Sequence, residues 1–201
     1  MSILILIRHG QSIYNLENRF TGSLDIGLTK FGVQEALLAG MKLMDFKFDI
    51  AYCSTLKRGK ESLRIILEEI DQTHIKVIEN KALNERDYGS LQGLNKDETI
   101  AKHGLEQVEI WRRSYAIRPP YGESLEDTYN RTIPFYKQEI EPKLKSDATI
   151  LIVAHGNTLR ALVMYLENIS EEEISNLNIP TGIPRQFVFD KNLKVLEVKY
   201  L

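Results

Sequence analysis

The stretch ILILIRHGQS, residues 3–12, carries a β-favouring apolar run straight into a histidine and a glycine. A later stretch, ILIVAHGNT at residues 150–158, repeats the same order of residue types. Short apolar runs of this kind that end near a glycine are typical of strands buried in a parallel sheet. A buried strand needs no histidine at its end, so the repetition indicates a chemical role for His9 and His155.

Strands and helices alternate through the rest of the chain, which indicates an α/β fold with a mostly parallel central sheet flanked by helices. Besides residues 3–7, the pattern predicts strands over 48–54, 75–80 and 149–154, and a terminal hairpin over 186–198. It predicts helices over 29–44, from Ser54 or Thr55 to Ile70, from Asn95 through Arg113, after Ser124, over 157–167 and after Ser170. Pro134 and Pro142 are expected to divide or kink the chain, because proline interrupts helical hydrogen bonding.

Two segments are expected to be irregular. Residues 8–28 form a long loop beside the end of the first strand, and residues 80–94 form a second irregular segment. Long loops inside a compact domain usually carry function. No internal repeat, low-complexity tract or linker divides the chain, so residues 1–201 are predicted to form one domain.

Composition excludes several classes of protein. The 26 Lys and Arg residues against 28 Asp and Glu residues give a net charge of −2, which argues against a general nucleic-acid binder. The single cysteine, Cys53, cannot form an intramolecular disulfide, which fits a reducing compartment. The apolar run at residues 3–7 is too short for a signal peptide, and no run approaches membrane-spanning length. The expected location is therefore the cytoplasm.

The two histidines are expected to share one site. Ligands of open α/β sheets bind beyond the carboxyl ends of the strands. His9 and His155 both follow such ends, so they are expected to face one another across a cleft. The glycine after each histidine lets the backbone turn sharply and lets a ligand approach closely.

A metal ion and a phosphate group are the two alternative ligands for such a pair. Histidine is the commonest transition-metal ligand, but no cysteine and histidine cluster or carboxylate-rich set accompanies these two. Instead the chain offers Arg8, Arg58 and the arginine pair at 112–113, and guanidinium groups match phosphate oxygens while repelling a metal cation. The pattern favours a phosphate site, in which one neutral imidazole attacks phosphorus while arginines and a protonated second imidazole neutralise the oxygens.

The segment LIRHGQSIYNLENRFTGSLDIGLTKFG, residues 6–32, resembles the opening of the histidine phosphatase superfamily. More narrowly, the chain resembles the cofactor-dependent (2,3-bisphosphoglycerate-dependent) phosphoglycerate mutases. The blocks that carry this narrower resemblance are NRFTG (18–22), STLKRGKES (54–62), LNERDYGSLQGLNKDET (83–99), WRRSY (111–115), GESLEDT (122–128), AHGNTLRALV (154–163) and LNIPTGIP (177–184). They span nearly the whole chain in family order. The resemblance implies a single three-layer α/β catalytic domain over residues 1–201, with a small helical and loop insertion.

The resemblance also implies an activity and the partners that go with it. The expected reaction is the glycolytic and gluconeogenic interconversion of 2-phosphoglycerate and 3-phosphoglycerate through a phosphohistidine, primed by 2,3-bisphosphoglycerate and independent of metal. The expected partners are a small phosphorylated substrate and, as one alternative for assembly, a second copy of the chain in a homodimer. Neither nucleic acid nor a membrane is expected as a partner.

Matching positions assign the catalytic roles. The resemblance makes His9 the phosphohistidine nucleophile. Arg8, Arg58 and His155 match the groups that orient and stabilise the transferring phosphoryl group. Glu85 matches the general acid/base that alternately takes and returns the proton of the substrate hydroxyl.

Further positions match the family's substrate-binding residues. The binding loop after His9 supplies hydroxyl, amide and backbone donors, and two arginines with a lysine are expected to hold the non-reacting phosphate. The full set is Ser12, Asn15, Thr21, Gly22, Arg86, Tyr88, Lys96, Arg112, Arg113, Gly156 and Asn157. Gly156 and Asn157 open a helix, where free N–H groups favour anions. His74 and His103 are expected to be exposed and without function.

The sequence departs from the family pattern in three places. Gln11 stands where the family usually has glutamate. The segment between Pro120 and GESL is shorter than in longer mutases, and the sequence ends at KYL without the tail that longer relatives fold over the site. Both shortenings are expected to admit water, which competes with substrate for the phosphohistidine. A short subgroup of bacterial mutases lacks the same insertion.

Two other functions compete with the mutase. One is a broad-specificity phosphomonoesterase of the same superfamily, which would need no dedicated binding group for a second phosphate. The other is a catalytically silent binding protein that keeps the pocket, and the joint presence of His9, Arg58, Glu85 and His155 argues against it.

Overall fold

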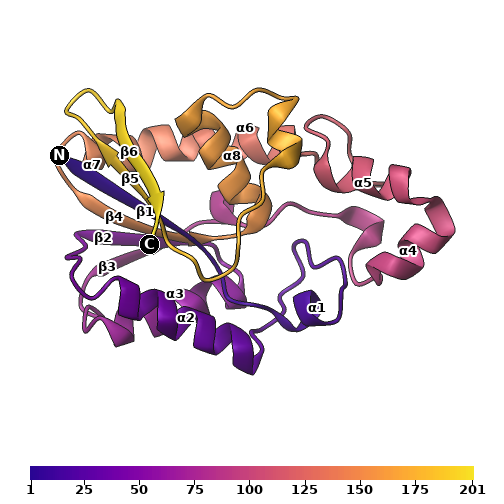
Figure 1. Cartoon of the computed structure of the whole chain (residues 1–201), viewed down its shortest axis with the longest axis horizontal. Helices are drawn as coiled ribbons and strands as arrows, with labels where there is room; N and C mark the ends of the chain where they lie inside the picture. Colours follow the sequence, from indigo (N-terminus) through magenta and orange to yellow (C-terminus); the bar gives the residue numbers. More distant parts are fainter.

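The computed structural model describes residues 1–201 as an α/β domain built on one six-stranded sheet (Figure 1). The strands are β1 (Ser2–Arg8), β2 (Ile50–Cys53), β3 (Lys76–Glu79), β4 (Thr149–Ala154), β5 (Arg185–Phe189) and β6 (Val195–Tyr200), in the spatial order β3-β2-β4-β1-β5-β6. The first four run parallel, while β5 pairs antiparallel with both β1 and β6. The predicted mostly parallel sheet and the terminal hairpin are confirmed.

Helices cover both faces of the sheet, which gives the three layers that the sequence predicts (Figure 1). One face packs against α2 (Lys30–Lys42) and α3 (Lys57–Glu69), and the other against α6 (Leu125–Phe135), α7 (Glu141–Leu144) and α8 (Gly156–Glu167). The alternating side chains of the buried strand β1 divide between the two cores: Leu4 and Leu6 face one, and Ile5 and Ile7 face the other. None of the helices is both long and apolar enough to cross a membrane.

A smaller lobe stands beyond the carboxyl ends of the parallel strands (Figure 1). It contains the 3₁₀ turn η2 (Gly89–Leu91) and the helices α4 (Lys96–His103) and α5 (Leu105–Arg113). A further 3₁₀ turn, η1 (Lys81–Leu83), lies on the segment that joins β3 to the lobe and packs into the main core through Leu83. The lobe's own apolar cluster of Phe20, Leu91 and Val108 ties it to the loop after β1. This is the predicted helical and loop insertion, and it forms one wall of the site.

The predicted long loop at residues 8–28 contains one short helix that the sequence pattern did not indicate. This helix, α1 (Ile13–Leu16), is opened by a capping box in which Ser12 and Asn15 exchange side-chain and backbone hydrogen bonds. Four residues are too few for an apolar periodicity to show in the sequence.

The single helix predicted from Asn95 through Arg113 is wrong, because the segment forms two helices that meet at Gly104. Gly104 has φ of +83° and ψ of 150°, a conformation that is essentially restricted to glycine. Asn95 does cap α4, accepting the backbone N–H groups of Asp97 and Glu98. The break turns α5 back toward the sheet, and the arginines at its end thereby reach the site.

The predicted cap of α3 by Ser54 or Thr55 is also wrong. The helix begins after Leu56, without a side-chain cap. Ser54 instead contacts a ring nitrogen of His155, and the Thr55 hydroxyl donates to Asn84 at 3.0 Å. The hydroxyls of both residues therefore form hydrogen bonds at the edge of the sheet where the site lies, and neither caps the helix.

The two prolines act as predicted. Pro134 lies inside α6, and the backbone after it widens into a π-helical turn, η3 (Tyr136–Ile140). Pro142 lies in the first turn of α7, where its missing N–H has no helical partner to lose. A last 3₁₀ turn, η4 (Glu173–Asn176), follows Ser170 as expected and precedes a loop over residues 177–184.

Candidate active site

His9 and His155 lie side by side because β1 and β4 are parallel neighbours. The register aligns Arg8 with Ala154, so each strand delivers its histidine to the same edge of the sheet. The two ring centroids are 4.9 Å apart with an interplanar angle of 57°, and both side chains are buried. The predicted juxtaposition of the two histidines is confirmed.

The hydrogen bonds of His9 define which of its nitrogens is free to react. Nδ1 lies 2.7 Å from the carbonyl oxygen of Gly10, which can only accept, so Nδ1 carries the hydrogen. Nε2 therefore holds the lone pair, and Arg58 Nε donates to it at 3.3 Å. Burial, followed by the charges of Arg58 and Arg8, holds the pKa of His9 well below its usual range. The ring is thus a neutral imidazole whose free nitrogen faces the cavity side occupied by Arg58.

Gly10 and the segment after it must approach α2 closely. A Cβ at Gly10 would lie 2.1 Å from the carbonyl oxygen of Gly32. The Gly10 N–H also donates to the hydroxyl oxygen of Ser62 on α3 at 3.0 Å. A side chain at this position would push His9 away from its place, which is why the motif needs glycine after histidine.

Arg58 is a buried arginine held by main-chain carbonyls. Its Nη1 and Nη2 donate to the carbonyl oxygens of Leu24 and Gly22, each at 2.7 Å. Burial lowers the pKa of Arg58 to about 10, so the guanidinium stays charged at neutral pH. The contacts fix its orientation against His9 and tie the 21–24 segment to α3.

Arg8 links the site to the 177–184 loop. Its Nη1 donates to the carbonyl oxygen of Ile179 at 2.8 Å, and its own carbonyl accepts the Gly182 N–H at 2.9 Å. Its Nε has no hydrogen-bond partner within the protein. Burial lowers the pKa of Arg8 more than the charge of the nearby Glu85 raises it.

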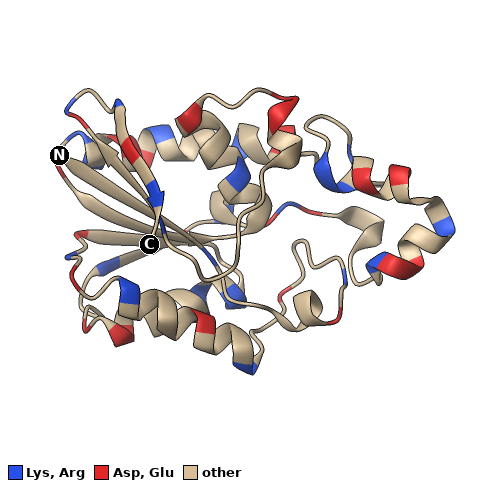
Figure 2. Cartoon of the chain, in the orientation of Figure 1, with Lys and Arg blue, Asp and Glu red and all other residues tan.

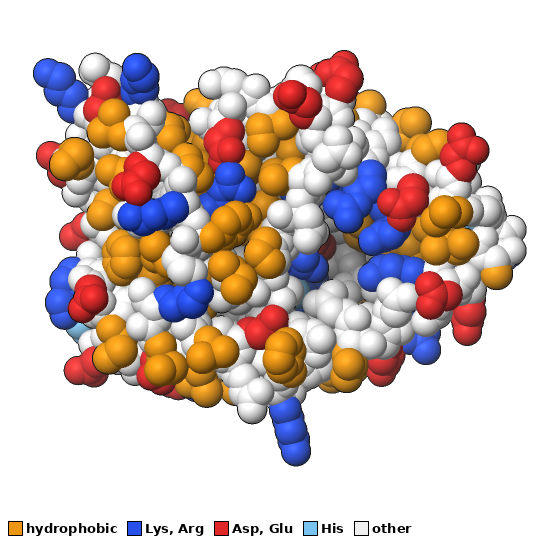
Figure 3. All heavy atoms as spheres, in the orientation of Figure 1, with side chains coloured by type: hydrophobic (Ala, Val, Ile, Leu, Met, Phe, Trp, Pro, Cys, Tyr) orange, Lys and Arg blue, Asp and Glu red, His pale blue; other side chains and the backbone are white.

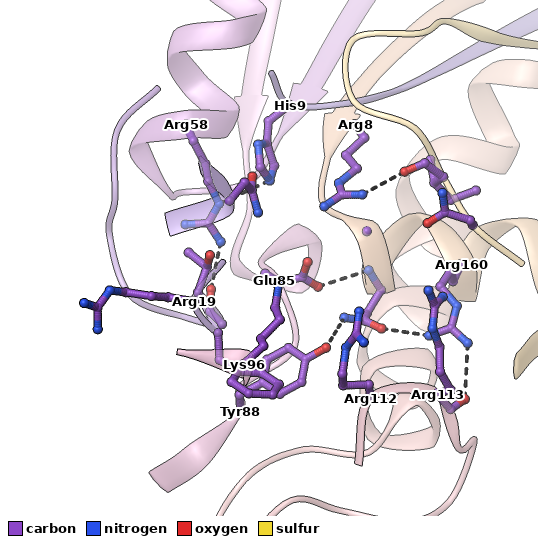
Figure 4. A pocket seen from close by; sticks show the side chains of 18 residues that line it. Arg8, His9, Arg19, Arg58, Glu85, Tyr88, Lys96, Arg112, Arg113 and Arg160 are labelled. Atoms are coloured by element: carbon purple, nitrogen blue, oxygen red, sulfur yellow. Dashed lines mark hydrogen bonds between the residues drawn. The ribbon is translucent and has the colours of Figure 1, made fainter. Parts of the chain in front are cut away.

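Glu85 is the one carboxylate in the cavity wall. Its Oε1 accepts two backbone N–H groups, from Arg86 at 2.9 Å and from Asn157 at 3.1 Å. In Figure 4 the carboxylate lies between the His9 end of the cavity and the cations opposite. A carboxyl held in this position can exchange a proton with a group bound between the two ends.

Seven basic side chains line the same cavity, which makes it strongly cationic (Figures 3 and 4). They come from β1, the 8–28 loop, α3, α4, α5 and α8, and are Arg8, Arg19, Arg58, Lys96, Arg112, Arg113 and Arg160. Figure 2 shows the basic segments of α5 and α8 on the side where the parallel strands end. Burial and the neighbouring Arg112 lower the pKa of Lys96. Such a surplus of cations over one carboxylate indicates an anionic ligand with more than one charged group.

Most of the predicted substrate-binding residues line this cavity. The wall contains Asn15, Thr21, Gly22, Tyr88, Lys96, Arg112, Arg113, Gly156 and Asn157. Asn157 and Tyr88 are in contact through an Asn157 Nδ2 to Tyr88 Oη distance of 3.4 Å. Although burial opposes it, the charge of Arg86 lowers the pKa of Tyr88.

Two predicted substrate-binding residues do not reach the cavity wall. Ser12 is buried and caps α1. Arg86 is also buried, with its Nη2 donating to the carbonyl oxygens of Trp111 and Arg112 and its guanidinium carbon 4.4 Å from the Tyr88 ring centroid. Both residues therefore support their neighbours, and Arg86 in particular fixes the end of α5.

Arg160 and Arg19 are cavity residues that the sequence reasoning missed. Arg160 is buried and donates to Asn157 Oδ1 at 3.0 Å and to the carbonyl oxygen of Ile174 at 2.7 Å. Burial lowers the pKa of Arg160 to about 10. Its position, one helical turn after Asn157, was the available signal, because residues three apart share a helix face. Arg19 belongs to the NRFTG block that carries the resemblance. Phe20, Asn178 and Ile179 complete the wall.

His74 and His103 lie away from the cavity and are exposed, as expected, with His103 packing its ring against Trp111. No group of three or more histidine, cysteine or carboxylate side chains is arranged to hold a metal ion.

The chain was compared with protein families and with individual proteins. Residues 4–199 match the model of the histidine phosphatase superfamily (branch 1). The chain is 52% identical over 201 residues to a 2,3-bisphosphoglycerate-dependent phosphoglycerate mutase of Cytophaga hutchinsonii, covering 100% of this chain and 94% of that protein. It is 52% identical over 191 residues to the protein of the same name from Parvibaculum lavamentivorans, covering 94% and 91% of the two chains.

Solved structures share the fold at lower identity. A mycobacterial glucosyl-3-phosphoglycerate phosphatase superposes with a TM-score of 0.85 at 23% identity, covering 100% of this chain and 97% of that one. The α-ribazole phosphatase from Shigella flexneri superposes with a TM-score of 0.83 at 24% identity, covering 98% and 95%. With a family model that matches nearly the whole length and a paired-histidine site at the strand ends, the chain belongs to the histidine phosphatase superfamily.

Proposed function

We propose that the protein is a phosphoglycerate mutase, which interconverts 2-phosphoglycerate and 3-phosphoglycerate through a phosphohistidine at His9. The single observation that carries this proposal is the two-ended cavity. One end holds the free Nε2 of His9 beside Arg58, and the other holds Lys96, Arg112 and Arg113, with Glu85 between them. The relatives at 52% identity, which bear the name of this enzyme, support the same conclusion.

The first step follows from the geometry of His9. The Nε2 lone pair attacks phosphorus, a P–N bond forms, and the bond between phosphorus and the departing substrate oxygen breaks. Arg58 and Arg8 lie beside this position and neutralise the phosphoryl oxygens as charge builds on them. Nδ1–H donates to the carbonyl oxygen of Gly10 throughout, which keeps the ring oriented and stabilises the positive charge that the ring gains.

Glu85 acts as the general acid and base for the substrate oxygen. In the protonated form it gives a proton to the departing oxygen, and in the ionised form it takes a proton from the hydroxyl that next attacks phospho-His9. Its two backbone hydrogen bonds, from residues on different segments, hold the carboxyl in one orientation for both steps.

The residues present fit 2,3-bisphosphoglycerate as the primer. When bound, this molecule supplies the phosphoryl group that loads His9. The two phosphates and the carboxylate of such a molecule match the surplus of cations at both ends of the cavity. Lys96, Arg112 and Arg113 would hold the phosphate that does not face His9, and Tyr88 with Asn157 would contact the part between them.

A phosphomonoesterase of the same superfamily is the alternative function. Hydrolysis needs the His9 end of the cavity and Glu85 but has no use for a second cluster of cations. The cations at the end of α5 and at the start of α4 therefore favour the mutase. The homodimer, the cytoplasmic location, metal independence and a single catalytic domain over 1–201 stay predictions.

The test compares three measurements on one purified sample and on its His9→Ala variant. The parent should interconvert the phosphoglycerates faster when 2,3-bisphosphoglycerate is added, and should keep its activity in the presence of excess chelator. It should also take up acid-labile, base-stable phosphate. The variant should lose turnover and phosphate uptake by at least roughly a thousand-fold, because the nucleophile is gone. A variant that keeps mutase turnover would remove His9 from its assigned role.

A further inference from the structure

His155 makes one hydrogen bond to the protein through its ring, and the partner is Ser54. The Nε2 atom of His155 lies 2.7 Å from the Ser54 hydroxyl oxygen, and both side chains are completely buried. Ser54 follows the last residue of β2, directly beside the end of β4 from which His155 projects. Nδ1 of His155 is buried and has no hydrogen-bond partner.

This contact is made possible by a glycine on α3. A Cβ at Gly59 would lie 2.5 Å from the Ser54 hydroxyl oxygen and 3.7 Å from Nε2 of His155. Only a residue without a side chain leaves the hydroxyl its position. The Ser54 to His155 contact is therefore built into three elements, β2, α3 and β4.

The hydrogen bonds of Ser54 and His155 indicate which ring nitrogen of His155 carries the hydrogen. The Ser54 oxygen has one other hydrogen bond, which it accepts from the Leu56 N–H at 3.3 Å. If Nε2 carried the hydrogen, it would donate to Ser54, and the serine's own hydrogen would have no acceptor. If Nδ1 carries the hydrogen, Ser54 donates to the bare Nε2, and every hydrogen except that on Nδ1 is satisfied. Each arrangement leaves one buried hydrogen without a partner, but the first also leaves the lone pair of Nδ1 without a donor. The second arrangement leaves fewer buried polar groups unpaired and is therefore favoured.

The strand order and the shape of the ring indicate where the unpaired Nδ1 is directed. The strand order places β2 and β1 on opposite sides of β4. Because the two ring nitrogens point in diverging directions, an Nε2 directed at Ser54 beside β2 leaves Nδ1 directed toward the side of β1 and His9. A phosphoryl group on His9 would therefore meet the hydrogen on Nδ1.

The charge state of His155 makes the tautomer important. Burial, followed by the charges of Arg58 and His9, holds the pKa of His155 well below its usual range, so the ring is neutral in the free site. The protonated second imidazole that the sequence suggested applies to a site that holds a phosphate, and it stays a prediction for that state. A neutral imidazole can help a phosphoryl group only if the nitrogen facing that group is the one that carries the hydrogen.

We propose that Ser54 is a positioning residue that holds His155 as the neutral Nδ1–H tautomer, aimed to donate a hydrogen bond to the phosphoryl group in transfer at His9. The inference rests on the phosphohistidine chemistry proposed above. Ser54 donates to Nε2 without giving up its proton, and it contacts neither substrate nor phosphorus.

The first test needs no substitution in the pair. In protein labelled with ¹⁵N at histidine, the protonated and bare nitrogens of a neutral imidazole resonate far apart, so a long-range ¹⁵N–¹H correlation spectrum reads the tautomer directly. The His155 signals are assigned by their loss in His155→Gln. The parent should show a protonated Nδ1 and a bare Nε2, and orthovanadate should shift the Nδ1 signal. A protonated Nε2 in the parent would overturn the proposal.

The second test uses Ser54→Ala and Ser54→Thr, with Ser2→Ala as the matched control. Ser2 is equally buried, makes no hydrogen bond through its hydroxyl and lies at the opposite end of β1. Ser54→Ala should redistribute the His155 tautomers and slow phosphorylation of His9 by about ten- to a hundred-fold, as expected for a lost hydrogen bond to a charged group. Ser54→Thr keeps the hydroxyl and should recover most of the rate, and Ser2→Ala should match the parent.

The outcomes separate this inference from the proposed function. A parent that never takes phosphate onto His9 would mean that the phosphohistidine itself is wrong. A parent that does so, while Ser54→Ala keeps both the tautomer and the phosphorylation rate, would overturn the role of Ser54 alone. If Ser54→Ala does not fold, as judged by circular dichroism against Ser2→Ala, the parent spectrum still decides.

Discussion

His9 is kept reactive by two opposing demands on the same side chain. A nucleophile must be unprotonated, and burial, followed by the charges of Arg58 and Arg8, achieves this by lowering the pKa of His9. The ring must also gain positive charge when it binds phosphorus, and the Gly10 carbonyl on Nδ1 offsets that cost. The same arginines that discourage a proton on His9 also attract a phosphoryl group to it.

The buried neutral histidines predict how stability depends on pH. Their pKa values are lowered in the folded protein, so the unfolded chain takes up protons first as the pH falls below the ordinary histidine value of about 6.5. The stability that they contribute is present above that pH and is lost below it. Each such histidine should lower the free energy of unfolding by roughly 1.4 kcal/mol for each pH unit below 6.5.

Urea unfolding of the ligand-free protein at several pH values between 7.5 and 5, in buffers without phosphate, measures this loss. The His9→Gln variant should show a shallower dependence by about one histidine's share. The exposed His74 offers the matched control, since His74→Gln removes an imidazole without opening the buried site. Parent and His9→Gln curves with the same slope would show that His9 is not held neutral.

The sequence predicts which histidines lie at the strand ends, but it does not predict their protonation states. The position of His9 and His155 follows from two apolar runs that end in the same way, and the sheet brings them together. Their charge and tautomer depend on Arg58 and Ser54, which come from another strand and helix. A short sequence window carries no information about such long-range neighbours.

At the scale of the elements, the break between α4 and α5 decides where the second cation cluster lies. A continuous helix from Asn95 would carry residues 112–113 away from the sheet, whereas the turn at Gly104 brings α5 back over the cavity. The apolar periodicity of the segment runs through the break, so periodicity predicts one helix. Only the glycine marked the possibility of a turn, and glycine inside a helical pattern is an ambiguous signal.

Gly104→Ala tests this element. No atom lies within 4 Å of the position that a Cβ would take, so the cost should come from the backbone conformation at φ of +83°. The variant should be destabilised by about 1–3 kcal/mol in urea unfolding. The KM for 3-phosphoglycerate should rise as α5 loosens, while hydrolysis of p-nitrophenyl phosphate changes little.

Gly27→Ala is the matched control for that variant. A Cβ there also meets no atom within 4 Å, but Gly27 is not in the left-handed region of backbone conformation. It should therefore be close to the parent in stability. Equal stability losses at the two glycines would show that the backbone of Gly104 is not what holds the two helices apart.

At the scale of the whole molecule, the site is a meeting of two parts with separate cores. The sheet and its helices supply His9, Arg58 and His155, and the lobe of α4 and α5 supplies Lys96, Arg112 and Arg113. Glu85 lies on the segment that joins β3 to the lobe, between the two sets. The division suits a reaction in which one phosphate reacts while the other is held.

A mutase depends on both parts of the site, whereas a phosphatase depends on the His9 end alone. A mutase must retain a bisphosphorylated intermediate while it exchanges one phosphate for the other in front of His9. The cations of the lobe bind this intermediate, and each charge-assisted hydrogen bond contributes about 1.5–3 kcal/mol to its binding. Arg113→Ala should therefore lower kcat/KM for 3-phosphoglycerate by about ten- to a hundred-fold.

Hydrolysis of p-nitrophenyl phosphate should fall much less in the same variant, because a small monophosphate engages only the His9 end. Escape of 2,3-bisphosphoglycerate into solution should become more frequent, since the intermediate is held by fewer contacts. Arg118→Ala is the control, because Arg118 is an exposed arginine paired with Asp127 outside the cavity, and it should match the parent on both substrates. If Arg113→Ala lost equal activity on the two substrates, the arginine would be serving the fold or the reacting end of the cavity. The second phosphate would then need another binding group, for which Arg160 and Arg19 are the remaining cations in the wall.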